Sequence, residues 1–124
     1  MFSTHLSTRS YDGRAVVALR GELDLVDAAA VAAALAAVAA REPQIIADLA
    51  GLDFIDSSGV AALARGRRKA RRAGGDLVLA APQQKVTRVL AVIRMAEAFS
   101  VYATVEDAAG EAGHQRKRAL HVAV

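Results

Sequence analysis

The stretch from Ala47 to Gly59 limits the possible folds of this chain more than any other part of it. An apolar strand ends in this stretch, a short loop follows, and Asp56-Ser57-Ser58-Gly59 opens the next predicted helix. Backbone N–H groups are unpaired at the first turn of a helix and the helix dipole is positive there, so this position favours negative charge. Two interpretations are open. The residues form an ordinary N-cap, for which Asp and Ser are common, or one serine accepts a phosphate.

Apolar runs and helical patterns alternate along the rest of the chain, and Asp12-Gly13 between the first two runs is a tight hairpin signal. The pattern predicts strands over residues 2–10, 14–23, 44–49, 76–81 and 99–102, with helices beginning near residues 24, 56, 82 and 104. The order β-β-α-β-α-β-α-β-α indicates an α/β fold with a mixed, mostly parallel sheet, an N-terminal β-hairpin and about four helices. At 124 residues the chain is long enough for one domain with one core.

Capping residues support the predicted helix starts. Asp24, with Asp27 three residues later, is similar to a capping box. Pro82 suits the first position of the third helix. Thr104 with Asp107 is expected to cap the last helix, which should reach about residue 112.

Two turns are expected to meet at one edge of the molecule. Gly21–Asp24 and Asp56–Gly59 each follow a strand of the parallel part of the predicted sheet. Because binding chemistry in such folds gathers at the carboxyl ends of the strands, both turns point to one candidate site.

Three segments carry a resemblance to the STAS domain of bacterial anti-sigma factor antagonists, namely Gly21–Asp24, Asp48–Leu49 and Phe54–Gly59. The element order and spacing are similar over roughly residues 4–112. We therefore expect a STAS domain over residues 1–112 and a mobile basic tail over residues 113–124. The Asp-Ser-Ser-Gly sequence is typical of the branch of this family that is phosphorylated on serine.

The resemblance implies a phosphoacceptor and a set of binding residues. Ser58 corresponds to the phosphorylated serine, with Ser57 as the second choice, and Asp24 corresponds to the acidic residue near it. The partner-binding residues implied are Asp24, Asp56, Ser57, Ser58 and Gly59. For Asp24, simple capping competes with a role beside the phosphorylation site, and both can hold.

The resemblance also implies partners. An anti-sigma factor of the serine-protein kinase type would modify the serine, and a phosphatase would restore it. In the unphosphorylated form the protein would bind the anti-sigma factor and so release a sigma factor for transcription. The alternative is a STAS subunit of a lipid-transport ABC complex, whose helix start docks on the ATPase subunit.

The chain lacks the residues that most classes of enzyme need for catalysis. The chain has no cysteine, and His5, His114 and His121 lack metal-ligand spacing, so we expect no metal site. No G-x-S-x-G elbow and no glycine-rich phosphate cradle occurs. Asp48 is a candidate phosphoaspartate of a receiver domain, but Tyr11-Asp12-Gly13 is a poor substitute for the acidic pair that holds magnesium there. We therefore expect neither an enzyme nor a cofactor.

The formal charge of +3 is unevenly distributed. Basic residues crowd the segments 65–72 and 116–118, but no nucleic-acid motif and no interleaved aromatic residues accompany them. We expect the first segment to be a solvated face, with docking of an acidic partner as the lesser alternative.

No signal peptide is expected at the N-terminus, and the longest apolar run, 28–40, is too short to span a bilayer. These features predict a cytoplasmic protein, without membrane insertion or direct nucleic-acid binding, that is a monomer or weak dimer.

Overall fold

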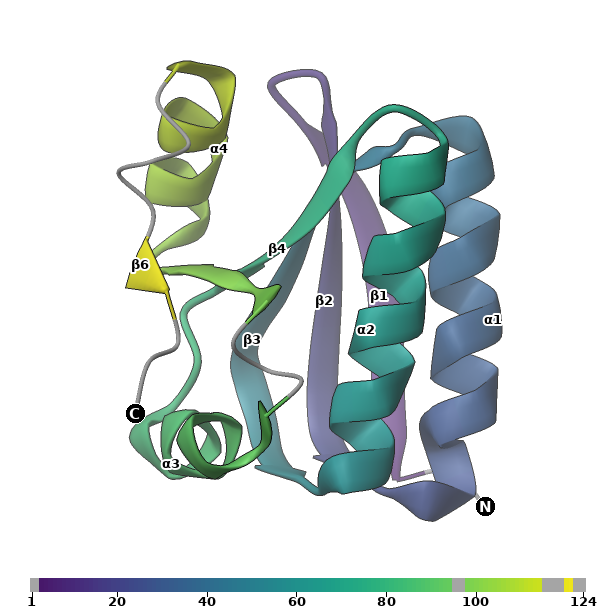
Figure 1. Cartoon of the computed structure of the whole chain (residues 1–124), viewed down its shortest axis with the longest axis vertical. Helices are drawn as coiled ribbons and strands as arrows, with labels where there is room; N and C mark the ends of the chain where they lie inside the picture. The colour runs from purple at the N-terminus through teal and green to yellow at the C-terminus, as the bar shows by residue number, and fades with distance from the viewer. Residues whose placement is uncertain (1–2, 95–97, 115–119, 122–124) are drawn as a thin grey trace.

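The computed structural model describes residues 3–94, 98–114 and 120–121 (Figure 1). Within these ranges, six strands form one sheet in the order β1-β2-β3-β4-β5-β6. The elements along the chain are β1 (Thr4–Tyr11), β2 (Arg14–Leu23), α1 (Leu25–Arg41), β3 (Gln44–Ile55), α2 (Ser57–Arg72), β4 (Asp76–Ala80), α3 (Gln84–Val92), β5 (Ser100–Tyr102), α4 (Val105–His114) and β6 (Leu120–His121). The predicted element order and the mixed sheet are confirmed.

The first two strands form the predicted hairpin. Asp12 and Gly13 have φ angles of 54° and 79°, the left-handed values that a two-residue hairpin turn requires. β1 pairs antiparallel with β2, whereas β2, β3, β4 and β5 pair parallel with one another. The alternation of the first strand predicts one face made of Phe2, Thr4, Leu6 and Thr8. Phe2 lies outside the described residues, and Leu6 and Thr8 are exposed.

Helices cover both faces of the sheet. α1 and α2 lie side by side over one face, and α4 lies on the other (Figure 1). The larger core cluster includes Leu19, Leu35, Leu49, Leu63 and Leu79, together with Val86 and Leu90 of α3. The smaller cluster joins Val16, Ile46 and Val78 of the sheet to Val105, Ala108 and Ala109 of α4. The continuous apolar run of β3 is therefore buried from both sides, as expected for a central parallel strand.

β3 is longer than predicted. The predicted strand stopped at Leu49 and was followed by a loop, whereas the strand continues to Ile55. Its register against β2 shifts twice, once between Ala18 and Arg20 and again between Gly21 and Glu22, so β3 carries one additional residue at each shift. With these bulges the strand continues through residues 50–53, which the apolar pattern assigns to a loop. Asp48 consequently lies within the strand and not at its end.

The predicted capping box at the start of α1 is wrong. The Asp24 side chain caps the helix by accepting from the N–H of Val26 at 3.0 Å. Asp27 does not reach back to Asp24. Its Oδ2 accepts from the backbone N–H groups of Ser3 and Thr4, each at 2.8 Å, and its side chain is buried. Asp27 therefore connects the start of the edge strand β1 to the start of α1.

The buried carboxylate of Asp27 makes stability depend on pH. Burial acts to raise its pKa, but the hydrogen bonds from Thr4 and Ser3 outweigh burial and hold the pKa below its ordinary value. Its stabilising contribution is therefore complete above the unfolded-state pKa of about 4 and is lost as the pH falls through the lower folded-state pKa. We expect urea unfolding to show a larger stability difference between the parent and Asp27→Asn at neutral pH than at about pH 3. A difference that stays constant across this range would contradict the assignment.

α3 begins later than predicted. Pro82 is not its first residue, because Gln83 is the N-cap and the helix begins at Gln84. Ala81 has a φ of 58° and donates its N–H to the carbonyl of Tyr102 at 2.9 Å. Because this left-handed conformation is not helical, α3 begins only after the turn. The spacing of Val86, Val89, Leu90 and Ile93 predicts one apolar stripe on this helix, and the structure confirms it: Val86 and Leu90 are buried, and Val89 and Ile93 pack against the same core.

The C-terminal elements extend past the predicted helix end. The hydroxyl of Thr104 accepts from the N–H of Asp107 at 2.9 Å, which confirms the predicted cap, and α4 continues to His114. Two residues of the predicted tail, Leu120 and His121, form β6 antiparallel to β5. The domain boundary at residue 113 and the mobility of the tail stay predictions. Among the described residues, no helix is both long and apolar enough to cross a membrane.

Candidate functional site

The two turns singled out in the sequence meet at one edge of the sheet. Leu23 and Ile55, the last residues of β2 and β3, pair in register. The N–H of Asp56 then donates to the carbonyl of Leu23 at 3.3 Å, which holds the second turn against the first. The starts of α1 and α2 consequently lie together at the lower end of the molecule (Figure 1). The convergence predicted for Asp24 and Asp56 is observed.

Each helix start is capped by its own aspartate. Asp24 caps α1, and Oδ1 of Asp56 accepts from the N–H of Gly59 at 3.0 Å. The carbonyl of Asp56 also accepts from the N–H of Val60 at 3.0 Å, which closes the first turn of α2. The capping interpretation is thus correct for both residues. The side chains of Ser57 and Ser58 take no part in either cap hydrogen bond.

Ser57 and Ser58 are the first two residues of α2. Ser57 is exposed and Ser58 is half-buried, and in the described part of the chain neither hydroxyl has a hydrogen-bond partner. An α-helix leaves its first N–H groups without intrahelical partners, and the Asp56 side chain takes up only that of Gly59. A phosphate on either hydroxyl would therefore lie beside unpaired donors and the positive end of the helix dipole.

Gly59 allows α2 to approach the strand ends closely. A Cβ atom at this position would lie 2.7 Å from Cγ1 of Ile55 and 2.8 Å from both Cγ and the carbonyl oxygen of Leu23. The glycine of the Asp-Ser-Ser-Gly sequence is thus required by packing. It fixes how deeply the two serines sit against the sheet edge.

Comparison with known proteins agrees with this arrangement. The STAS domain family matches residues 5–108, which include every element from β2 to α3. This chain belongs to the STAS domain family. The anti-sigma-F factor antagonist RsfA of Mycobacterium tuberculosis is similar to it, with 31% identity over 102 residues that cover 79% of each chain.

Two solved structures show the same fold as this STAS domain. An anti-sigma factor antagonist from Mycobacterium paratuberculosis superimposes with a TM-score of 0.79 at 28% identity, covering 90% of this chain and 95% of the other. The anti-sigma factor antagonist SpoIIAA in its unphosphorylated form gives a TM-score of 0.69 at 24% identity, with coverage of 84% and 92%.

Exposed apolar side chains that the sequence analysis did not select occur at the starts and ends of the elements that form this edge of the STAS domain. Leu25 and Val26 at the start of α1 are 76% and 72% exposed, and Phe54 near the end of β3 is 46% exposed. A signal was present in the sequence, because Leu25 and Val26 fall off the helical stripe of Val31 and Leu35 that faces the core. Large exposed apolar side chains beside a small polar surface are typical of protein interaction sites.

α3 supports the end of β3 next to this site. The side-chain amide of Gln83 donates to the carbonyl of Ala50 at 2.9 Å and to Oδ1 of Asp53 at 3.1 Å. Lys85 forms an ion pair with the same carboxylate at 3.7 Å. Sequence reasoning missed this contact because it placed Ala50 and Asp53 in a loop.

In the part of the chain that the structure describes, no three acidic or histidine side chains come together as a metal site would require.

Proposed function

We propose that this protein is an anti-sigma factor antagonist that acts by binding and not by catalysis. In its unphosphorylated form it binds an anti-sigma factor in the cytoplasm through the starts of α1 and α2. Phosphorylation of Ser58 by a serine-kinase type of anti-sigma factor abolishes binding, and a phosphatase restores it. Sigma-factor-dependent transcription then follows the phosphorylation state of this one residue.

The observation that carries this proposal is the position of Ser58. Ser58 is the second residue of α2, and its hydroxyl has no hydrogen-bond partner among the residues that the structure describes. It follows the capping residue Asp56 and lies at the same edge of the sheet as Asp24. The exposed side chains of Leu25, Val26 and Phe54 add an apolar surface to the polar helix start. Because the starts of α1 and α2 lie together, a partner that packs on Leu25 and Val26 would lie next to the serines, and a phosphate there would be at the interface. The similarity to RsfA supports the same class of partner.

A kinase assay with matched serine variants tests the phosphoacceptor. The parent, Ser57→Ala and Ser58→Ala are incubated with the candidate anti-sigma kinase and ATP, and the label is located by phosphopeptide mapping. We expect Ser58→Ala to lose the label completely, while Ser57→Ala keeps it, because only the hydroxyl of residue 58 is the acceptor. Both variants should still bind the anti-sigma factor. Label on Ser57 alone, or on neither serine, would overturn the assignment to Ser58.

A pull-down tests the class of partner. The alternative, a STAS subunit of a lipid-transport ABC complex, would use the same helix start to dock on an ATPase. Recovery of a serine-kinase type of anti-sigma factor with the parent, and its loss with a Leu25→Glu and Val26→Glu double variant, supports the proposal. Recovery of a transporter ATPase with the same dependence would replace it.

A further inference from the structure

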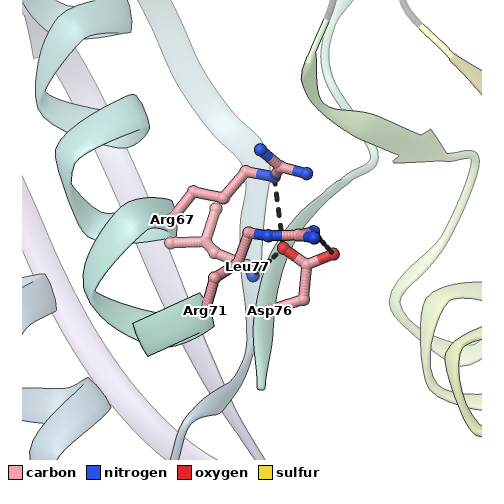
Figure 2. A network of polar contacts seen from close by, with 4 residues as sticks. All are labelled: Arg67, Arg71, Asp76 and Leu77. Carbon is pink, nitrogen blue, oxygen red and sulfur yellow. Dashed lines mark hydrogen bonds and ion pairs between the residues drawn. The ribbon is translucent and has the colours of Figure 1, made fainter. Parts of the chain in front are cut away.

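The basic residues of α2 divide into two groups. Arg67 and Arg71 point toward the start of β4, where their side chains form ion pairs with Asp76 at 3.1 and 3.6 Å (Figure 2). The same carboxylate accepts from the N–H of Leu77 at 2.8 Å, so these two arginines are held in place. Their role is structural, because they connect the end of α2 to the sheet.

The second group faces α1. Arg65, Arg68, Lys69 and Arg72 line one wall of a groove of about 430 Å³, and its floor is formed by Ala29, Ala32, Ala33 and Ala36. We call these eight residues the basic groove. Its four cationic side chains are exposed, and no carboxylate lines it. Among the described residues, none of the four has an ion-pair partner.

Each side of the basic groove follows one face of one helix. The residues of the wall are spaced three and four positions apart along α2, and those of the floor are spaced in the same way along α1. This spacing places each set on one side of its helix. From residue 65 to residue 72 the wall is about 10 Å long, or two helical turns. α1 and α2 lie side by side along this length (Figure 1). Because alanine presents only a methyl group, another backbone can approach the floor closely.

We propose that the basic groove binds an acidic helical segment of a partner protein. A helix with Glu or Asp on one side, spaced three and four residues apart, would place its carboxylates against the wall and small apolar residues against the alanine floor. Along α2 the wall begins at Arg65, about 10 Å from Ser58. On α1 the floor begins at Ala29, one turn from Leu25, so the groove continues from the Ser58 surface along both helices.

Other occupants match the groove less well. Single-stranded nucleic acid binding depends on aromatic side chains for base stacking, and none lines the groove. Half of its lining is alanine, which offers phosphates nothing to bind. A membrane surface is bound by large apolar side chains beside the cations, and the groove has none of these either.

A peptide titration of the full chain tests the proposal. The probe is an alanine-based peptide of about 18 residues with glutamates on one helical face. Its control has the same composition with the glutamates distributed around the helix. We expect the first peptide to bind more tightly, with amide chemical shift changes confined to α1 and the second half of α2. No shift at about 1 mM peptide, or equal binding of the two peptides, would overturn the proposal.

Three variants separate the groove from general charge attraction. Arg68→Glu with Arg72→Glu is expected to lower the affinity for the peptide about tenfold or more, since two attractive contacts become repulsive. Arg88→Glu with Arg94→Glu makes the same change in net charge on two exposed residues, one in α3 and one just after it. This variant is expected to change the affinity for the peptide less than about twofold. Ala33→Leu fills the floor and should also lower the affinity. Equal effects of the two charge variants would contradict a specific groove.

The same variants identify a different occupant if there is one. Short single-stranded DNA and vesicles with anionic lipid are titrated alongside the peptide. Tighter binding of either one that is lost in Arg68→Glu with Arg72→Glu would overturn the acidic helix in favour of that ligand. Because the assay contains no anti-sigma factor and no kinase, its result is independent of the function proposed for Ser58.

Discussion

We expect phosphorylation of Ser58 to lower the affinity for the anti-sigma factor about a thousandfold without unfolding the protein. A phosphoserine adds a charge of about −1.5 to −2 at pH 7. A like-charge pair about 4 Å apart costs roughly 4 kcal/mol at an effective dielectric constant near 20. This energy corresponds to about a thousandfold in the dissociation constant. One acidic group of the partner facing the helix start is enough for this effect.

The fold itself should accept the phosphate. Ser57 and Ser58 precede the capped N–H of Gly59, so their own N–H groups are free to donate to a phosphate oxygen. An anion at a helix N-terminus gains about 0.3–1 kcal/mol from the dipole. The carboxylates of Asp24 and Asp56 act in the opposite direction, because accepting a cap hydrogen bond leaves their negative charge in place. We expect these opposing effects to leave the fold intact, so that the switch acts through the interface and not through unfolding.

Two measurements on one sample check this prediction. Calorimetric titration gives the affinity of the anti-sigma factor for the phosphorylated and unmodified proteins, and thermal unfolding gives their melting temperatures. Ser58→Ala treated with kinase is the control and should bind like the unmodified protein. Unchanged affinity after complete phosphorylation would contradict the switch. A large fall in melting temperature would instead show that the phosphate acts by disrupting the fold.

The order of strands and helices could be predicted because each is encoded locally. Asp12-Gly13 specifies its hairpin, and the side chains of Asp24, Asp56 and Thr104 each cap the helix predicted to start there. Buried apolar runs in β3 and β4 predict a parallel sheet without any knowledge of what covers it. The convergence of the two turns then follows from the topology.

What the sequence did not reveal depends on contacts between distant residues. Asp27 looks like half of a capping box, but its partners are Ser3 and Thr4, more than twenty residues away. The two bulges in β3 are set by its pairing with β2. The arginines of α2 look alike in the sequence, and only the position of Asp76 divides them into a structural pair and the wall of the basic groove.

Gly59→Ala is expected to destabilise the protein by about 2 kcal/mol, although alanine is the better helix former. Alanine gains up to about 1 kcal/mol over glycine within a helix. At Gly59, however, the added methyl would meet Ile55 and the backbone carbonyl of Leu23 at less than 3 Å. Adding a methyl group to a closely packed site typically costs about 1–3 kcal/mol. Because one contact is with backbone at the end of a strand, we expect the upper end of this range, about 3 kcal/mol, from which the gain in helix propensity of about 1 kcal/mol is subtracted.

Gly110→Ala is the matched control for this substitution. Gly110 lies within α4, and a Cβ atom there would have no neighbour within 4 Å, so we expect a gain of up to about 1 kcal/mol. Urea unfolding of the parent and the two variants measures the difference, and Gly59→Ala should also melt about 8 °C lower. Gly59→Ala with the stability of the parent would mean that α2 can move away from the strand ends. The position of Ser58 against Leu23 and Ile55 would then not be fixed by packing.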